Sequence, residues 1–204
     1  MAKSPNTGNR KAPAGRLRIV AGKWRSRPLE IADVEGLRPT SERVRETLFN
    51  WLAPVIEGSR CLDLFAGTGA LGLEALSRGA ASVVFVDSSR RALTVIEKNV
   101  RSLHAEGAII RHGDALRFVQ TAAPGSFDVV FLDPPFAADL LDGICQRIDE
   151  AKILAPGAMV YLERDKAQAE PSLPATWQVL RDKVAGQVRY SLVTAEPQAH
   201  WRGK

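Results

Sequence analysis

Four consecutive residues, Asp133-Pro134-Pro135-Phe136, directly follow the apolar stretch FDVVFL at residues 127–132. The two prolines fix the backbone and provide no N–H donors, so the turn offers a carboxylate, main-chain carbonyls and an aromatic ring. These groups suit a planar amino group. Its two hydrogens would be held by the Asp133 side chain and the Pro134 carbonyl, while its nitrogen faces an electrophile. Phe136 could stack on the attached base, a contact worth about 1–3 kcal/mol. We therefore predict that Asp133, Pro134, Pro135 and Phe136 are catalytic, against the simpler interpretation of a turn that ends a strand.

A glycine-rich segment, DLFAGTGALG at residues 63–72, precedes this turn in the chain. Glycines allow a tight turn and a close approach of the backbone to a ligand, and a following helix presents free N–H groups. Asp87 ends the next apolar stretch about 20 residues after Gly67, where dinucleotide-binding folds hold a ribose hydroxyl. The combination predicts a cofactor that contains adenosine, and it leaves NAD and S-adenosylmethionine both open. The predicted cofactor-binding residues in this part of the chain are Asp63, Phe65, Ala66, Gly67, Gly69, Asp87 and Ser88.

A weaker signal follows the third apolar stretch, where Asp114 and Ala115 come directly after Gly113. An acid and a free backbone N–H at this point could bind the exocyclic amine and a ring nitrogen of adenine. Aspartate is also a favoured residue at the start of a helix, so Asp114 could simply cap one. Both interpretations can hold together, and we predict Asp114 and Ala115 as cofactor-binding residues.

The elements that must position these residues alternate between strand and helix. Strands are expected at 61–65, 82–86, 108–110, 127–132 and 159–162, with helices through 70–78, 92–103, 115–121 and 140–148. A further strand pair, 177–180 and 188–193, flanks a turn at Ala185-Gly186-Gln187. This alternation predicts an α/β fold with a mostly parallel seven-stranded sheet, helices on both faces and an antiparallel end. Ligands of such sheets bind at the carboxyl ends of the strands, where the residues described above would lie.

Positive charge is concentrated at the beginning of the chain. Residues 1–45 contain 11 Lys and Arg but four acids, whereas the remainder contains 17 basic and 19 acidic residues. A polyanion such as RNA is a natural partner for this segment, although a solvated tail would show the same charge. We expect a disordered basic tail over 1–16, a small hairpin over 17–29, and a helix that begins near Pro39 and Thr40 and ends by Gly58.

Several classes of protein are disfavoured by composition. No apolar run approaches the roughly 20 residues that a membrane span needs, and Met1 to Gly15 lacks the apolar core of a secretory signal. Two cysteines make no disulfide framework, and no cluster of Cys and His suggests a metal site. Cys61 is expected in the core, and His104, His112 and His200 facing solvent. A cytoplasmic, monomeric protein is the default expectation.

The motifs of this sequence, taken together, resemble those of a known family. DLFAGTG followed by DPPF resembles the amino-methyltransferases of the class I Rossmann-like fold, which use S-adenosylmethionine. More specific segments are similar to the RsmD family of guanine-N2 methyltransferases, which act on small-subunit ribosomal RNA. These segments are RIVAGKWR at 18–25, GLRPT at 36–40, VRETLFNWL at 44–52, GLEALSRG at 72–79 and KVAGQV at 183–188. The resemblance runs from about residue 16 to about residue 195.

The resemblance implies a role for each part of the predicted site. The 63–69 loop and Asp87 would hold the methionine moiety and the ribose of S-adenosylmethionine, Asp114 and Ala115 the adenine, and 133–136 the target guanine. Asp87 stands where the family commonly has Glu, and it should still reach the ribose hydroxyls. Residues 17–57 would face RNA, 58–195 would form the methyltransferase domain, and 196–204 a C-terminal tail. The predicted substrate-binding residues are Lys23, Arg25, Arg38, Thr40 and Tyr190, and the expected partner is ribosomal RNA or a small-subunit assembly particle.

Three other functions compete with this prediction. A NAD-dependent oxidoreductase would explain the glycine loop but would leave DPPF without a role. A DNA adenine-N6 or cytosine-N4 methyltransferase would use the same chemistry, but it usually carries a target-recognition domain to extrude a base, and none is visible here. A non-catalytic RNA-binding module would explain only the basic N-terminus. The choice of guanine over adenine rests on the resemblance alone, because both amines fit the physical argument.

Overall fold

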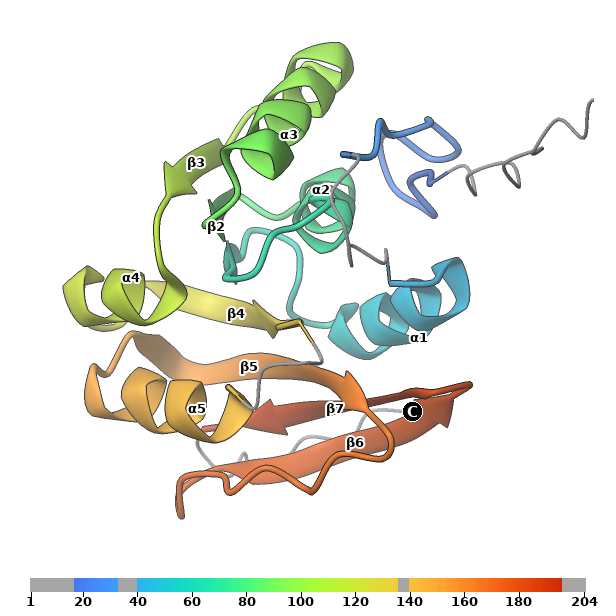
Figure 1. Cartoon of the computed structure of the whole chain (residues 1–204). Helices are drawn as coiled ribbons and strands as arrows, with labels where there is room; N and C mark the ends of the chain where they lie inside the picture. Colours follow the sequence, from blue (N-terminus) through green and yellow to red (C-terminus); the bar gives the residue numbers. More distant parts are fainter. Residues whose placement is uncertain (1–16, 33–39, 136–139, 196–204) are drawn as a thin grey trace, which may run out of the picture.

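A computed structural model describes residues 17–32, 40–135 and 140–195, and within them it contains a seven-stranded sheet flanked by helices (Figure 1). The strand order is β3-β2-β1-β4-β5-β7-β6. Neighbouring strands from β3 to β5 are parallel, whereas β7 is antiparallel to both β5 and β6. The strands are β1 (Arg60–Asp63), β2 (Ser82–Asp87), β3 (Ala108–His112), β4 (Phe127–Leu132), β5 (Leu154–Asp165), β6 (Gln178–Ala185) and β7 (Val188–Thr194). The predicted α/β architecture with an antiparallel end is thus confirmed.

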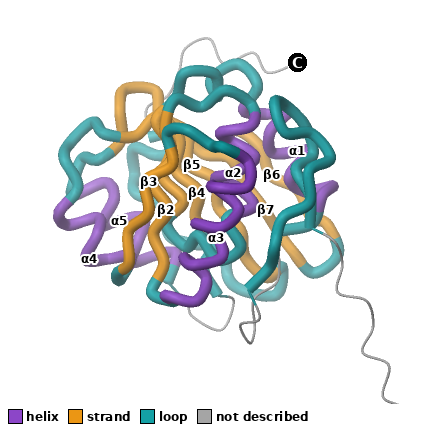
Figure 2. The backbone as a smooth tube through the Cα atoms, turned by 90° about the horizontal axis from the view of Figure 1, so that it is seen from above, coloured by secondary structure: helices purple, strands orange, loops and turns teal. Residues whose placement is uncertain are grey.

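Five helices within the described residues cover the two faces of this sheet (Figure 2). They are α1 (Glu42–Leu52), α2 (Ala70–Ser77), α3 (Arg90–Leu103), α4 (Ala115–Thr121) and α5 (Leu141–Glu150). Apolar residues of α1, α2 and α3 form one core cluster with one face of the sheet. Those of α4 and α5 form a second cluster with the opposite face. The central strand β4 is buried on both sides, which explains why its sequence is an almost continuous apolar run.

The predicted hairpin is present at the start of the described chain. Leu29 N–H donates to Leu17 C=O at 2.8 Å, and Ser26 N–H donates to Ile19 C=O at 2.9 Å, so residues 17–29 form a short antiparallel loop. The loop crosses α2, where Lys23 N–H donates to the Ser77 carbonyl at 2.7 Å. Gly22 adopts φ +83°, and a Cβ there would lie 1.9 Å from the same carbonyl oxygen, so this contact requires glycine.

Trp24 is buried in the core cluster that contains residues of α1. The tryptophan therefore fixes the hairpin to the helices. Cys61 is buried as expected, and His104 and His112 are exposed, while His200 lies outside the described residues. In the described part of the chain, no helix has the length and hydropathy needed to cross a membrane.

Two strands, β5 and β6, are longer than the sequence predicts by several residues each. β5 was expected at 159–162 but extends over Leu154–Asp165. It begins where Leu154 pairs with Phe127 of β4, and it ends where Asp165 pairs with Val188 of β7. Pro156 and Gly157 are unusual inside a strand, so the sequence does not predict the first half of β5 as a strand. β6, expected at 177–180, extends to Ala185 as an exposed edge strand whose polar side chains give no apolar alternation. β6 pairs along its length with β7, the next strand of the chain, across the turn at Gly186 and Gln187.

Candidate active site

A cavity of about 930 Å³ opens at the carboxyl ends of β1, β2, β4 and β5, where the sequence placed the ligand. This volume lies within the range of about 300–1,000 Å³ that is usual for small-molecule sites. All the predicted cofactor-binding residues except Gly69 line it, together with Thr40, Asp133, Pro134 and Pro135. Gly69 lies just behind the wall, where its positive φ of 73° begins α2. The fold therefore assembles around one space all the predicted cofactor-binding residues except Gly69, together with Asp133, Pro134 and Pro135 of the predicted catalytic residues.

The glycine turn is held by the acid at the end of β2. The Asp87 carboxylate accepts a hydrogen bond from Gly67 N–H at 2.8 Å and another from Ser89 N–H at 2.7 Å. Gly67 has φ +50°, a left-handed conformation that favours glycine. A carboxylate can accept about four hydrogen bonds, so Asp87 retains acceptor positions for ribose hydroxyls. Its predicted role is compatible with this geometry.

Asp63, at the end of β1, is a buried acid with 2% of its surface exposed. Its side chain accepts a hydrogen bond from Gly72 N–H at 3.0 Å. Burial raises the pKa of Asp63 to about 7, and the nearby charge of Asp87 adds to the rise. A cation in the cavity would oppose both effects and keep Asp63 ionised.

The cavity wall is strongly acidic. Among the described residues it includes six carboxylate side chains and no Lys, Arg or His: Asp63, Asp87, Asp114, Asp133, Glu163 and Asp165. Such a wall favours a cationic ligand and disfavours the pyrophosphate of a nicotinamide dinucleotide. S-adenosylmethionine carries a sulfonium and an ammonium group, so the residues present fit this cofactor.

Asp114 caps a helix, as one of its two interpretations required. Its side chain accepts a hydrogen bond from Arg117 N–H at 2.9 Å at the start of α4. Asp114 and Ala115 also line the cavity, and their contact with an adenine stays a prediction.

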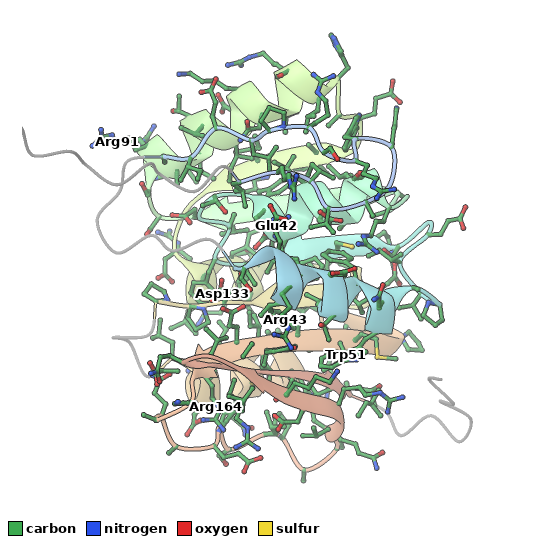
Figure 3. The ribbon with its side chains drawn as sticks, turned by 90° about the vertical axis from the view of Figure 1, so that its right-hand side faces the viewer. Glu42, Arg43, Trp51, Arg91, Asp133 and Arg164 are labelled. Atoms are coloured by element: carbon green, nitrogen blue, oxygen red, sulfur yellow. The ribbon has the colours of Figure 1, made fainter. Side chains whose placement is uncertain are left out.

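Asp133 lies at the end of β4 beside the start of α1 (Figure 3). The Thr40 hydroxyl donates to its carboxylate at 3.1 Å. Burial raises the pKa of Asp133 well above its ordinary value, and the neighbouring charge of Glu163 raises it further. The pKa of Glu163 is also raised by burial, although hydrogen bonds with Tyr161 and Thr40 oppose this rise. Two adjacent acids with raised pKa values form the polar centre of the site.

A buried ion pair positions Thr40 at this centre. Arg45, on α1, has no exposed surface; its Nε donates to the Thr40 carbonyl at 3.3 Å. Its Nη1 pairs with Glu74 of α2 at 3.2 Å. The Glu74 carboxylate also accepts hydrogen bonds from the backbone N–H groups of Val20 and Ala21, at 2.7 and 2.9 Å. Glu74 therefore joins the hairpin, α1 and α2 behind the acid pair.

The remaining predicted substrate residues lie elsewhere. Lys23 and Arg25 are exposed on the hairpin, outside the cavity wall. Tyr190 was predicted to line the base pocket, but the structure places its ring in the core rather than on the cavity wall. The ring stacks on Trp51 at 5.4 Å between ring centroids. Arg38 and Phe136 fall outside the described residues.

Glu163 and Arg45 were missed by sequence reasoning. Glu163 directly follows the predicted strand at 159–162, so asking what comes after that strand would have found it. Arg45 gave no comparable signal, because charged residues on a helix usually face solvent.

The strand order, the antiparallel β7 between β5 and β6, and the glycine turn after β1 define the class I Rossmann-like fold of S-adenosylmethionine-dependent methyltransferases. The protein is an enzyme of this class. Residues 17–194 match the model of the family described as "Conserved hypothetical protein 95", and the chain belongs to this family.

Relatives with known names agree with this assignment. The chain is 45% identical to ribosomal RNA small subunit methyltransferase D of Escherichia coli strain K12, over 91% of this chain and 93% of that protein. It is 43% identical to the Haemophilus influenzae protein of the same name, over 87% of this chain and 93% of that protein. The solved structure of yhhF from Escherichia coli superimposes with a TM-score of 0.82 at 43% identity, covering 90% of this chain and 100% of that chain. The resemblance to the RsmD family is confirmed, and the dehydrogenase and non-catalytic alternatives are not supported.

Proposed function

We propose that the protein transfers a methyl group from S-adenosylmethionine to the exocyclic N2 amine of a guanine in small-subunit ribosomal RNA. The observation that carries the proposal is the presence of Asp133, Pro134 and Pro135 on the wall of the acid-lined cavity. The 45% identity to a protein named as a ribosomal RNA small subunit methyltransferase supports this substrate class. The partner is free ribosomal RNA or a small-subunit assembly particle, which a monomeric enzyme meets in the cytoplasm.

The cavity residues would hold the cofactor in an order set by the strands. Among the residues of the cavity wall, Asp63 would bind the ammonium of the methionine part, Asp87 the ribose hydroxyls, and Asp114 with Ala115 the adenine. When bound, S-adenosylmethionine supplies a methyl group on a positively charged sulfur, which is a good leaving group. The same acid-rich wall that binds the cation excludes anionic competitors.

The residues after β4 would orient the attacking nitrogen. The Asp133 carboxylate accepts one N2–H and the Pro134 carbonyl accepts the other, so the nitrogen lone pair is directed into the cavity. Phe136 is proposed to stack on the base. Once N2 carries the methyl group it holds a surplus proton, and Asp133 can accept it, because its raised pKa makes it a stronger base than an ordinary aspartate.

The N-terminal part, residues 17–57, is proposed to bind RNA outside the cavity, next to the catalytic domain at 58–195. Lys23 and Arg25 are exposed on the hairpin, from which they would contact phosphates. Thr40 connects the two parts, because its hydroxyl contacts Asp133 and its carbonyl contacts Arg45. Arg38 is also proposed to bind RNA, near the opening of the cavity.

The decisive experiment is methyl transfer from tritiated S-adenosylmethionine to ribosomal RNA and to genomic DNA, both isolated from a strain that lacks the gene. Label recovered as N2-methylguanosine in small-subunit RNA is the expected result. Label recovered in DNA, as N6-methyladenine or N4-methylcytosine, would keep the chemistry but replace the proposed substrate.

A matched pair of variants tests the role of Asp133. Asp133→Asn should lose at least about 100-fold in kcat, because the neutral amide oxygen is a weaker acceptor than a carboxylate and the amide takes up no proton. Its affinity for S-adenosylmethionine, measured by calorimetry, should stay within about threefold of wild type. Asp128→Asn, at the opposite end of β4 where Asp128 pairs with Arg60, should retain full kcat.

A further inference from the structure

Glu163 lies beside Asp133 because of the register of two parallel strands. Leu132 of β4 pairs with Leu162 of β5, so the residues that follow them lie side by side, on strands about 4.8 Å apart. Phe131 and Tyr161, two positions earlier, both belong to the core cluster that includes α1. Side chains two apart on a strand share a face, so Asp133 and Glu163 both point toward α1.

Glu163 keeps acceptor positions for a ligand beside its hydrogen bonds with Tyr161 and Thr40. Only 4% of its surface is exposed, yet it forms part of the cavity wall. The Tyr161 hydroxyl donates to Glu163 Oε2 at 2.6 Å and fixes the carboxylate from behind. Because a carboxylate accepts about four hydrogen bonds, acceptor positions remain on the side of the cavity. When both acids are ionised, the site therefore presents two adjacent acceptors, one from each acid.

Two adjacent acceptors are complementary to one base. Guanine carries its amino group next to N1–H, so two neighbouring positions of its Watson–Crick edge are donors. Adenine and cytosine carry theirs next to a ring nitrogen that only accepts hydrogen bonds. An extruded base is recognised through this edge.

We infer that Glu163 accepts the N1–H of the target guanine while Asp133 accepts an N2–H, and that this pair of acids selects guanine over adenine and cytosine. The inference rests on the proposed function and adds the residue that determines specificity. With adenine or cytosine, the Glu163 carboxylate would face a ring acceptor, and two buried acceptors would be left without a donor. Sites that lose a buried hydrogen bond in this way discriminate strongly against the wrong substrate.

The test uses a small-subunit RNA fragment that carries either guanine or 2-aminopurine at the methylated position. 2-Aminopurine keeps the 2-amino group, but its N1 is an acceptor. Wild-type enzyme should prefer guanine by at least about tenfold in kcat/KM. Glu163→Gln offers an amide donor as well as an acceptor, so this preference should fall at least about tenfold. 2-Aminopurine also lacks the O6 of guanine, but this difference affects the wild-type enzyme and the variant equally. Comparing their preferences therefore cancels it.

Asp165→Asn is the matched control, because Asp165 is another acid of β5 on the cavity wall and lies two residues further along. Its preference for guanine should equal that of wild type. Equal losses on both RNAs in Glu163→Gln would mean a structural role and would overturn the inference while leaving the proposed function intact. Should that variant fail to fold, equal wild-type rates on the two RNAs would overturn it as well. A wild-type enzyme that methylates DNA but not the guanine RNA would instead refute the proposed function.

Discussion

Replacing Glu74 by glutamine should cost far more stability than the same replacement at the surface. Glu74 and its partner Arg45 have no exposed side-chain surface, and their atoms lie 3.2 Å apart. The glutamine leaves the Arg45 charge buried without an anion, and it keeps one acceptor oxygen where Val20, Ala21, Arg45 and Arg78 all donate. Removing one partner of a buried pair typically costs about 3–5 kcal/mol.

The assay is urea and thermal unfolding of Glu74→Gln beside Glu42→Gln. Glu42 pairs with Arg18, but their side chains are 42% and 56% exposed, so its loss should cost only about 0–1 kcal/mol. For a chain of this length, about 3–5 kcal/mol lowers Tm by roughly 6–20 °C. Adding Arg45→Met to Glu74→Gln removes the unpaired charge and should recover part of the loss. The reasoning is refuted if the two glutamine variants are equally stable, or if the double variant is less stable than Glu74→Gln.

Three further predictions concern the site and the hairpin. Thr40→Val should move the acidic limb of the pH profile of kcat to higher pH. The hydrogen bond from Thr40 stabilises ionised Asp133, the form that activity requires, so its removal raises the pKa of Asp133. An acidic limb at the wild-type pH in initial-rate measurements would contradict this. Affinity for S-adenosylmethionine should weaken as pH falls through about 7, where Asp63 takes up a proton, and calorimetry should find that Asp63→Asn binds weakly with no such dependence. Replacing Lys23 and Arg25 by alanine should raise the KM for RNA and reduce the slope of log affinity against log salt by about 0.7–0.9 for each phosphate that is no longer neutralised, as measured by filter binding; an unchanged slope would remove the hairpin from the interface.

The sequence predicted those parts of the fold that are determined locally. β4 and α4 have the predicted bounds, because an apolar run marks the strand and Asp114 caps the helix. The extra length of β5 was not predictable, since it depends on pairing with β4 and β7, strands more than twenty residues away in the chain.

The candidate site divides in the same way. Asp63, Asp87 and Asp133 each follow a recognisable strand, and one rule about strand ends places all of them at the cavity. Tyr190 also borders a turn, but whether it faces the cavity or the core depends on its packing against Trp51 of α1. No local pattern contains that information.

The first described part of the chain has no core of its own. Leu17, Ile19 and Trp24 of the hairpin share one apolar cluster with residues of the sheet and with Tyr190 of β7. Trp51 of α1 rests on that tyrosine, which the ribosome adds 139 residues later. At about 5–20 residues per second, synthesis from Trp51 to Tyr190 takes roughly 7–28 s, and during this time the apolar face of α1 lacks part of its final packing. The hairpin and α1 are therefore synthesised before the sheet that completes their core, and their apolar faces stay exposed until β7 has been made.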